Sequence, residues 1–134
     1  YRKFYLEKNK YTGFFFGLPY AMETIWKTEE VFLTEGIIDL VCLLKIKPNC
    51  ISPLTANLGE FQIRWLKRYV KKVYLLFDPD KKGREAVNKL RDSLGDEITV
   101  HSINLLGKDV NDMILTKGIK DFEMYIEEKL EFFS

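Results

Sequence analysis

Short apolar segments alternate with longer amphipathic ones along most of this chain of 134 residues, and this alternation restricts the fold more than any other feature. A strand buried on both faces of a sheet reads as a short apolar run, whereas a surface helix repeats its apolar residues every three to four positions. Strands are therefore predicted at residues 31–34, 50–52, 73–77 and 98–103, and helices at residues 36–46, 59–70, 83–94, 111–116 and 120–132. This order predicts an α/β fold, with about four parallel strands, helices on both faces and right-handed crossovers.

The composition fits one globular unit and excludes several other classes. With 46% hydrophobic residues and 21 Lys plus Arg against 20 Asp plus Glu, the chain can bury a core and has a net charge of only +1. Disorder is excluded, and any binding of nucleic acid must come from a local basic patch rather than from the overall charge. The apolar runs are too short for a membrane span and no secretory signal is visible, so we expect a cytoplasmic protein with no membrane partner.

The first 26 residues are predicted to form an N-terminal extension, and residues 27–134 the main domain. Apolar residues 4–6 and 14–16 flank a polar turn, which favours a hairpin or edge strands. Pro19 suits the first turn of a short helix ending near residue 25. A first residue other than Met is expected for a processed product or for a segment of a larger protein.

The chain has two cysteines and one histidine, Cys42, Cys50 and His101. These are too few for the Cys-rich cage of a structural zinc site, so we expect both thiols to be buried packing residues. His101 falls within a predicted strand without an acidic neighbour in sequence, and a packing role is favoured over a catalytic one.

Acidic side chains follow three of the four predicted strands. Glu35 ends the first, with Asp39 one helical turn later, Asp78 and Asp80 end the third, and Asp109 follows the fourth. Since the carboxyl ends of parallel strands share one edge of a sheet, we expect Glu35, Asp78, Asp80 and Asp109 to converge on one crevice. Such a cluster repels itself unless a cation neutralises it, which predicts a divalent metal site.

Oxygen ligands without His or Cys suit hard ions, so Mg²⁺ or Mn²⁺ is expected, as in phosphoryl transfer. In an extended segment Asp78 and Asp80 would point the same way, and Pro79 would help to hold that segment extended. Each motif alone also has an ordinary interpretation: DPD as a turn, Glu35 as the start of a helix, and Asp109 or Asn111 as a helix cap. Only their joint occurrence at strand ends indicates a site.

Two groups of basic residues are candidates for contacts with phosphate. Arg64, Lys67, Arg68, Lys71 and Lys72 recur at helical spacing and would share one helix face, while Trp65, Leu66, Tyr69 and Val70 would occupy the other. That basic face either is simply solvated or follows a template backbone.

Lys81, Lys82 and Arg84 directly follow the DPD motif, and Lys108 precedes Asp109. These cations would meet nucleotide phosphates, although Lys108 could equally pair with Asp109. Gly83 would let the following helix start close to the sheet, with backbone N–H groups free for an anion.

These motifs together resemble the Toprim domain, the catalytic fold shared by bacterial-type primases, topoisomerases and some nucleases. The primase branch is the most similar: FGLPYA at residues 16–21 resembles a segment that precedes the domain, LTANLGEFQ at residues 54–62 a threonine and glutamine element, and FDPDKKGREA at residues 77–86 the FDxDxxGxxA motif. The resemblance covers most of the chain and implies a Toprim, Rossmann-like fold with a small β/α extension.

The resemblance also implies a function, namely the catalytic domain of a DnaG-type primase, a nucleotidyltransferase that makes RNA primers in DNA replication. Divalent metal would be held by Glu35, Asp39, Asp78, Asp80 and Asp109, with Glu35, Asp78 and Asp80 in catalytic roles. The implied partners are a single-stranded DNA template, ribonucleoside triphosphates, and a replicative helicase or other primase domains.

One position departs from the DnaG pattern. DnaG-type primases commonly carry an acid where this chain has Asn111, whereas phage and mitochondrial primase-helicases often have Asn there. Asn offers a carbonyl oxygen with less charge, which puts a second metal ion in doubt.

Two other functions remain open, and one is disfavoured. A Toprim nuclease would use the same acids, and a non-catalytic module could bind a replication partner. A response-regulator receiver is disfavoured because its acidic pair follows the first strand, where this chain has Glu35 and Gly36. The chain lacks the zinc module of a complete primase, so efficient catalysis by these residues alone is not expected.

Overall fold

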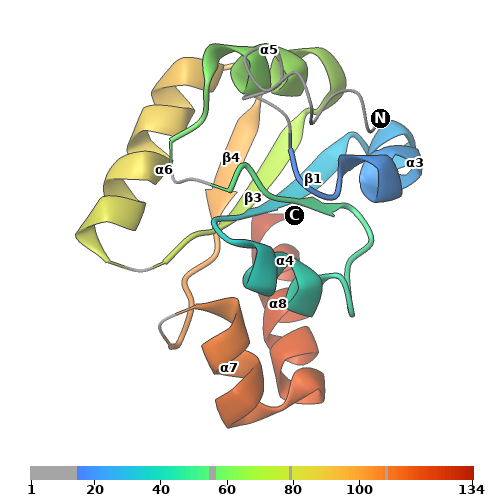
Figure 1. Ribbon diagram of the computed structural model, residues 1–134, viewed down its shortest axis with the longest axis vertical. Coiled ribbons are helices and arrows are strands. Elements are labelled where there is room, and N and C mark those ends of the chain that lie inside the picture. The colour runs from blue at the N-terminus through green and yellow to red at the C-terminus, as the bar shows by residue number, and fades with distance from the viewer. Residues whose placement is uncertain (1–14, 55–56, 79, 108) are drawn as a thin grey trace.

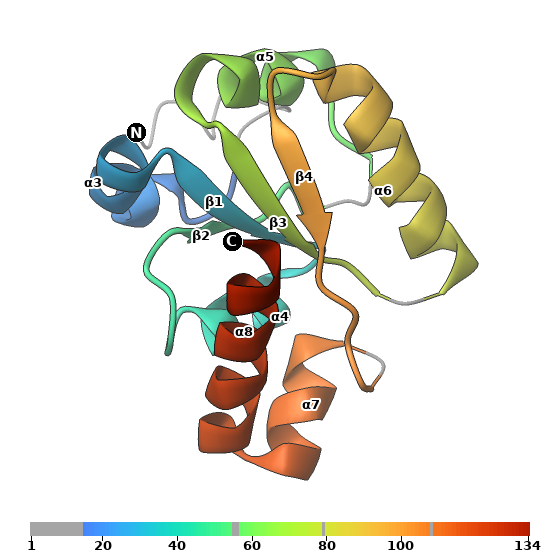
Figure 2. The ribbon, with the colours of Figure 1, turned by 180° about the vertical axis from the view of Figure 1, so that it is seen from behind.

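The computed structural model describes residues 15–54, 57–78, 80–107 and 109–134 and has the predicted α/β alternation (Figures 1 and 2). The strands are β1 (Glu30–Thr34), β2 (Cys50–Ile51), β3 (Lys72–Leu76) and β4 (Thr99–Ser102). The helices are α3 (Leu18–Thr28), α4 (Ile37–Leu43), α5 (Glu60–Tyr69), α6 (Lys81–Leu94), α7 (Val110–Lys117) and α8 (Ile119–Phe133). Each predicted strand and helix of the main domain is present, which confirms the fold class.

The four strands form one parallel sheet in the order β2-β1-β3-β4. Phe32 of β1 pairs with Cys50 on one side and with Tyr74 of β3 on the other, and Tyr74 pairs with His101 of β4. Because every strand runs the same way, their carboxyl ends lie along one edge, as the prediction of a shared crevice requires.

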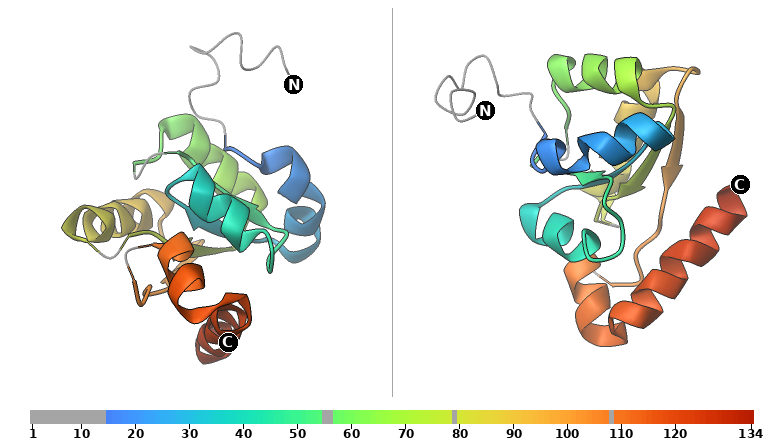
Figure 3. Two further views of the ribbon diagram at one scale, coloured as in Figure 1. Left: turned by 60° about the horizontal axis from the view of Figure 1, so that its bottom comes forward. Right: turned by 90° about the vertical axis from the view of Figure 1, so that its right-hand side faces the viewer.

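Alternate residues of the strands pack on opposite faces of the sheet, as the pleat dictates. Val31 and Leu33 face a core closed by α3, α5 and α6, while Phe32 faces one closed by α4, α7 and α8. Helix α8 runs back from α7 beside the sheet (Figure 3). There His101 stacks on Tyr74 and Phe133, with ring centroids 5.6 and 4.2 Å apart, which agrees with its predicted packing role.

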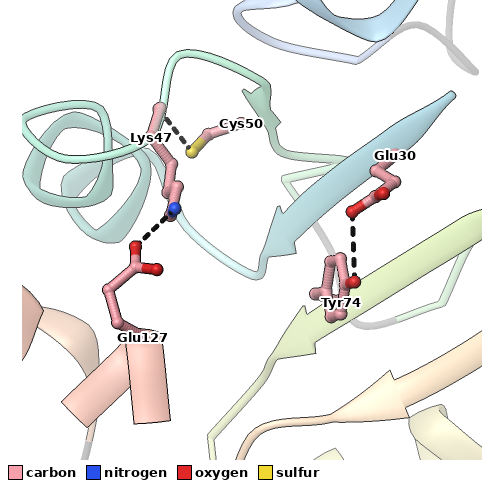
Figure 4. A network of polar contacts seen from close by, with 5 residues as sticks. All are labelled: Glu30, Lys47, Cys50, Tyr74 and Glu127. Carbon is pink, nitrogen blue, oxygen red and sulfur yellow. Dashed lines mark hydrogen bonds and ion pairs between the residues drawn. The ribbon is translucent and has the colours of Figure 1, made fainter. Parts of the chain in front are cut away.

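An ion pair links α8 to the segment between α4 and β2 (Figure 4). Lys47 Nζ lies 2.6 Å from Glu127 Oε1, and the same ammonium stands 5.9 Å from the centre of the Phe32 ring. The Cys50 thiol donates to the carbonyl oxygen of Lys47 at 2.9 Å. Cys50 and Cys42 are free and buried, as predicted, and burial raises the pKa of both thiols.

The boundaries of several elements differ from the prediction. Helix α3 is longer than expected, α4 stops at Leu43 rather than near residue 46, and α5 stops at Tyr69 because Val70 is extended and packs into the core. Within the described parts of the chain, no helix is long and apolar enough to cross a bilayer.

Most of the predicted N-terminal hairpin, residues 1–14, lies outside the described residues. The part that is described pairs elsewhere, since Phe16 forms an antiparallel bridge with Ser52 through backbone hydrogen bonds of 2.7 and 3.0 Å. Helix α3 contributes Leu18, Ala21 and Ile25 to the same core as the sheet. The division of the chain after residue 26 stays a prediction.

Candidate acidic site

The carboxyl edge of the sheet gathers acids from separate parts of the chain. Glu35 follows β1 and Asp78 lies two residues after β3, and the Asp78 N–H donates to Glu35 Oε1 at 2.9 Å. Asp39 lies in the first turn of α4 and is only 7% exposed, and its Oδ1 accepts the Asn111 N–H at 3.1 Å. These two hydrogen bonds join the end of β1 to the end of β3, and α4 to α7.

The charges of the acids act on one another, which shows that they share one local field. Burial raises the pKa of Glu35, and the charges of Asp78, Asp80 and Asp39 raise it further, against the lowering effect of the Asp78 N–H. Burial, followed by Asp109 and Asp80, raises the pKa of Asp78. Burial also raises the pKa of Asp39 to about 6, with contributions from Asp109 and Asp78, while its bond from Asn111 opposes the shift. The acids therefore lie near one another at this edge of the sheet, and their role as metal ligands stays a prediction.

Asp80 and Asp109 also cap helices. Asp80 Oδ1 accepts the Gly83 N–H at 2.7 Å at the start of α6, and Asp109 Oδ1 accepts the Asp112 N–H at 2.8 Å at the start of α7. The capping interpretation is thus correct for Asp109, and Asp80 is a cap that the sequence did not predict. Of the backbone N–H groups expected to be free for an anion at this helix start, that of Gly83 is not free, because it donates to Asp80.

Gly83 brings α6 against the end of β3. A Cβ atom at this position would lie 1.9 Å from the carbonyl oxygen of Asp78 and 3.3 Å from Asp80 Oδ1. Only a residue without a side chain fits there, which confirms the predicted close start of this helix. Pro79, proposed to hold the segment extended, lies outside the described residues.

Among the residues described, no three His, Cys, Asp or Glu side chains form a ready-made metal cage. Four of the acids, Glu35, Asp39, Asp80 and Asp109, each direct one oxygen to a backbone N–H. The donor set nevertheless suits a hard cation, because its ligands are carboxylates and their mutual repulsion would be relieved by a positive charge.

Basic residues surround one side of this site. Lys81 and Lys82 are exposed in the first turn of α6, and Arg84 lines a cavity of about 190 Å³ together with Asp78 and Asn104. The cavity therefore joins a carboxylate of the acidic cluster to a guanidinium from α6. Lys108, the fourth predicted phosphate contact, lies outside the described residues.

The predicted basic helix face is wrong in its extent. Helix α5 ends at Tyr69, so Lys71 and Lys72 leave it; Lys71 Nζ lies 3.4 Å from Glu29 Oε2, and Lys72 begins β3. Arg64, Lys67 and Arg68 remain on the helix, and they line a hollow together with aromatic side chains that were assigned to the opposite face.

Ser52 orders the site, although no sequence motif singles it out. Ser52 follows β2 and is fully buried, and its hydroxyl donates to the Glu35 carbonyl at 3.1 Å and accepts the Leu54 N–H at 3.0 Å. It thereby ties the backbone of Glu35 to a loop in which Leu54 has a positive φ of 63°. No sequence signal distinguishes such a serine from an ordinary one at the end of a strand.

We expect Ser52→Ala to lower the free energy of unfolding by about 1–2 kcal/mol, because two backbone groups would be left without their buried partner. Chemical denaturation measures this change, with Ser93→Ala on the exposed face of α6 as the control. Equal stability of the two variants would show that the Ser52 hydroxyl does not order the loop.

Known proteins share both this sequence and this fold. The family model described as Toprim-like matches residues 32–114. A DNA primase of Lactococcus lactis is 35% identical over 112 residues, which are 82% of this chain and 17% of that protein. The chain thus spans about a fifth or less of the length of the curated relatives it matches first.

Solved structures of primases superpose on the chain. The Aquifex aeolicus primase, solved with its zinc-binding and RNA polymerase domains, matches with a TM-score of 0.74 and 31% identity over 87% of this chain and 30% of that one. A DnaG primase catalytic domain bound to single-stranded DNA matches with a TM-score of 0.70 and 22% identity over 87% of this chain and 39% of that one, which shows a shared fold.

Proposed function

This chain belongs to the Toprim-like family, and from that premise we propose that it is the catalytic Toprim domain of a DnaG-type primase. In a larger polypeptide or complex it would support the template-directed joining of ribonucleotides into RNA primers. The observation that carries the proposal is the gathering of Glu35, Asp39, Asp78, Asp80 and Asp109 at one sheet edge. Burial and the neighbouring carboxylates raise the pKa of Glu35, Asp39 and Asp78 there.

The acids would have different roles in binding Mg²⁺ or Mn²⁺. Glu35, Asp78, Asp80 and Asp109 would offer the oxygens not engaged by backbone N–H groups, and the more deeply buried Asp39 would shape the site by holding Asn111. A bound divalent ion supplies charge stabilisation to the phosphoryl oxygens and orients the attacking hydroxyl. The raised pKa of Glu35 would suit an acid–base function in its proposed catalytic role.

The cavity beside Asp78 supports a site for the incoming nucleotide. Arg84 lines it, and Lys81 and Lys82 lie one turn earlier on α6, so a triphosphate near the acids would meet cations from a single helix. We propose that these three residues, with Lys108, receive the phosphates.

The remaining partners would come from outside these residues. The DnaG catalytic domain that shares this fold was solved with single-stranded DNA, which supports a DNA template as partner. A zinc-binding module and a replicative helicase or other primase domains would complete the machinery, and the proposed compartment is the cytoplasm.

The proposal is tested by supplying Mn²⁺, ribonucleotides and a short RNA primer annealed to a DNA template. We expect slow addition of single ribonucleotides, abolished by Asp78→Asn and retained by Asp121→Asn, an exposed acid of α8. Cleavage of the strands that Asp78→Asn abolishes would instead assign the site to a nuclease. Activity that persists unchanged in Glu35→Gln and Asp78→Asn would contradict any catalytic role for the acids.

A further inference from the structure

A hollow of about 540 Å³ runs along helix α5. This helix lies at the end of the sheet where β3 and β4 begin (Figure 1). It lies at the end of the sheet opposite to the acidic site, which follows the carboxyl ends of the strands. Six residues of this one helix line it: Phe61, Arg64, Trp65, Lys67, Arg68 and Tyr69. We call this feature the α5 groove.

Three aromatic rings line the α5 groove. Trp65 and Tyr69 are one turn apart, with ring centroids 5.1 Å apart, and Phe61 precedes them by one more turn and is 49% exposed. Phe15 contacts Trp65 edge-on at 5.7 Å, which holds the indole in place against the core. Rings that are fixed from behind and open in front can take up a flat ligand at little entropic cost.

Cations lie between these rings. Arg64, Lys67 and Arg68 line the same hollow, and the Arg68 guanidinium stands 5.5 Å from the centre of the Tyr69 ring. Arg64 approaches Glu60 at 3.6 Å, but both side chains are strongly exposed, so this pair offsets little of the charge.

The charge of this groove contrasts with that of another helix. The outer surface of α8 has a hollow lined by Glu123, Met124, Glu127, Glu128 and Glu131. A chain with a net charge of +1 thus separates its charges, with cations and aromatic rings on α5 and carboxylates on α8. The α5 groove is therefore complementary to a polyanion that carries flat rings.

We propose that the α5 groove binds single-stranded nucleic acid, with bases stacked on Phe61 and Trp65 and phosphates beside Arg64, Lys67 and Arg68. Single strands combine exposed base faces with a regular line of phosphates, and stacking platforms with flanking cations are how proteins hold them without sequence preference. A duplex hides its base faces and would use only the cations. This binding needs neither the acids nor a metal, so it stands apart from the proposed catalytic function.

Tryptophan fluorescence tests the groove directly, because the chain has only two tryptophans, Trp26 and Trp65. In Trp26→Phe, titration with oligo(dT) in EDTA should quench the emission of Trp65. Phe61→Ala should weaken binding roughly tenfold, within the range of one stacked base. Phe132→Ala, which removes an 84% exposed ring from α8, should leave the affinity unchanged.

The salt dependence of binding tests the role of the cations. Replacing Arg64, Lys67 and Arg68 with Gln should reduce the slope of log affinity against log salt by about 2, because each phosphate that a cation neutralises on a single strand contributes roughly 0.7 to that slope. Lys117→Gln with Lys120→Gln, two exposed cations near the junction of α7 and α8, should not change the slope. Glu35→Gln should bind oligo(dT) normally, so a failed catalytic proposal and a failed groove are distinguishable.

Three results would overturn the proposal. The first is the absence of quenching, or equal affinity of Phe61→Ala and the unchanged chain. The second is full competition by inorganic polyphosphate at equal phosphate concentration, since it would show binding of charge without stacking. The third is concentration-dependent self-association that Phe61→Ala abolishes, which would assign the groove to protein–protein contact.

Discussion

Gly83→Ala is expected to lower the free energy of unfolding by about 3 kcal/mol and to weaken divalent metal binding. The added Cβ would meet the carbonyl oxygen of Asp78 at 1.9 Å, a backbone atom that cannot rotate away. Helix α6 would have to withdraw from the end of β3, and overpacking of this kind typically costs about 1–3 kcal/mol, occasionally more. The shift would also break the bond from the Gly83 N–H to Asp80 and separate Asp78 from Asp80.

Urea denaturation of Gly83→Ala measures the loss of stability, and Mn²⁺ titration measures the loss of metal affinity. Gly59→Ala is the matched control, since this glycine also stands at the start of a helix on the sheet but has open space around it and a negative φ of −79°. We expect the control to lose about 1 kcal/mol or less, because at an N-cap Ala is less favourable than Gly but meets no clash. If Gly83→Ala behaved like Gly59→Ala, the close approach of α6 to β3 would be contradicted.

Asp39→Asn is expected to stabilise the metal-free chain at pH 7.5 by about 2 kcal/mol. The folded-state pKa of Asp39 is raised to about 6 from 3.8, so the folded state binds its proton more tightly than the unfolded state does. Stability from this group is therefore present below about pH 4 and is lost as the pH rises through 6. A pKa difference of about two units between the folded and unfolded states corresponds to roughly 3 kcal/mol of lost stability at high pH. Asn would avoid most of this loss because it has no charge to bury and keeps an oxygen for the Asn111 N–H.

The test is chemical unfolding in EDTA at intervals between pH 4 and 7.5. The unchanged chain should lose stability across this range, and Asp39→Asn should lose less. Asp92→Asn on the exposed face of α6 is the control and should follow the unchanged chain. A steeper loss in Asp39→Asn than in the unchanged chain would contradict the raised pKa.

The strands and the convergence of the acids could be predicted because both follow from strong local rules. Buried parallel strands need continuous apolar runs, and residues 31–34 and 73–77 have them. Once these strands are parallel, Glu35 and Asp78 must end at the same edge, whatever the sequence between them. A glycine at the start of the helix that follows the third strand also predicted that this helix packs closely against the sheet, and Gly83 does allow this close packing.

Other features depend on tertiary contacts that the sequence pattern does not encode. The spacing of cations continued past Arg68 to Lys71, but Val70 leaves the helix to pack against the core, so the basic face is shorter than predicted. Helical periodicity assigned Trp65 to the buried side, whereas its ring both contacts Phe15 and lines the α5 groove. The hydroxyl of Ser52 meets Glu35 only because β2 lies beside β1.

Backbone amide signals during Mn²⁺ titration test most directly whether the acids form one cation site. If they do, paramagnetic broadening at low Mn²⁺ should begin at the amides of Glu35, Asp78 and Asp109, spare those of α5 and α8, and disappear in Asp78→Asn. Signals that stay sharp up to millimolar Mn²⁺, or that broaden first along the glutamates of α8, would contradict a shared metal site at the carboxyl edge of the sheet.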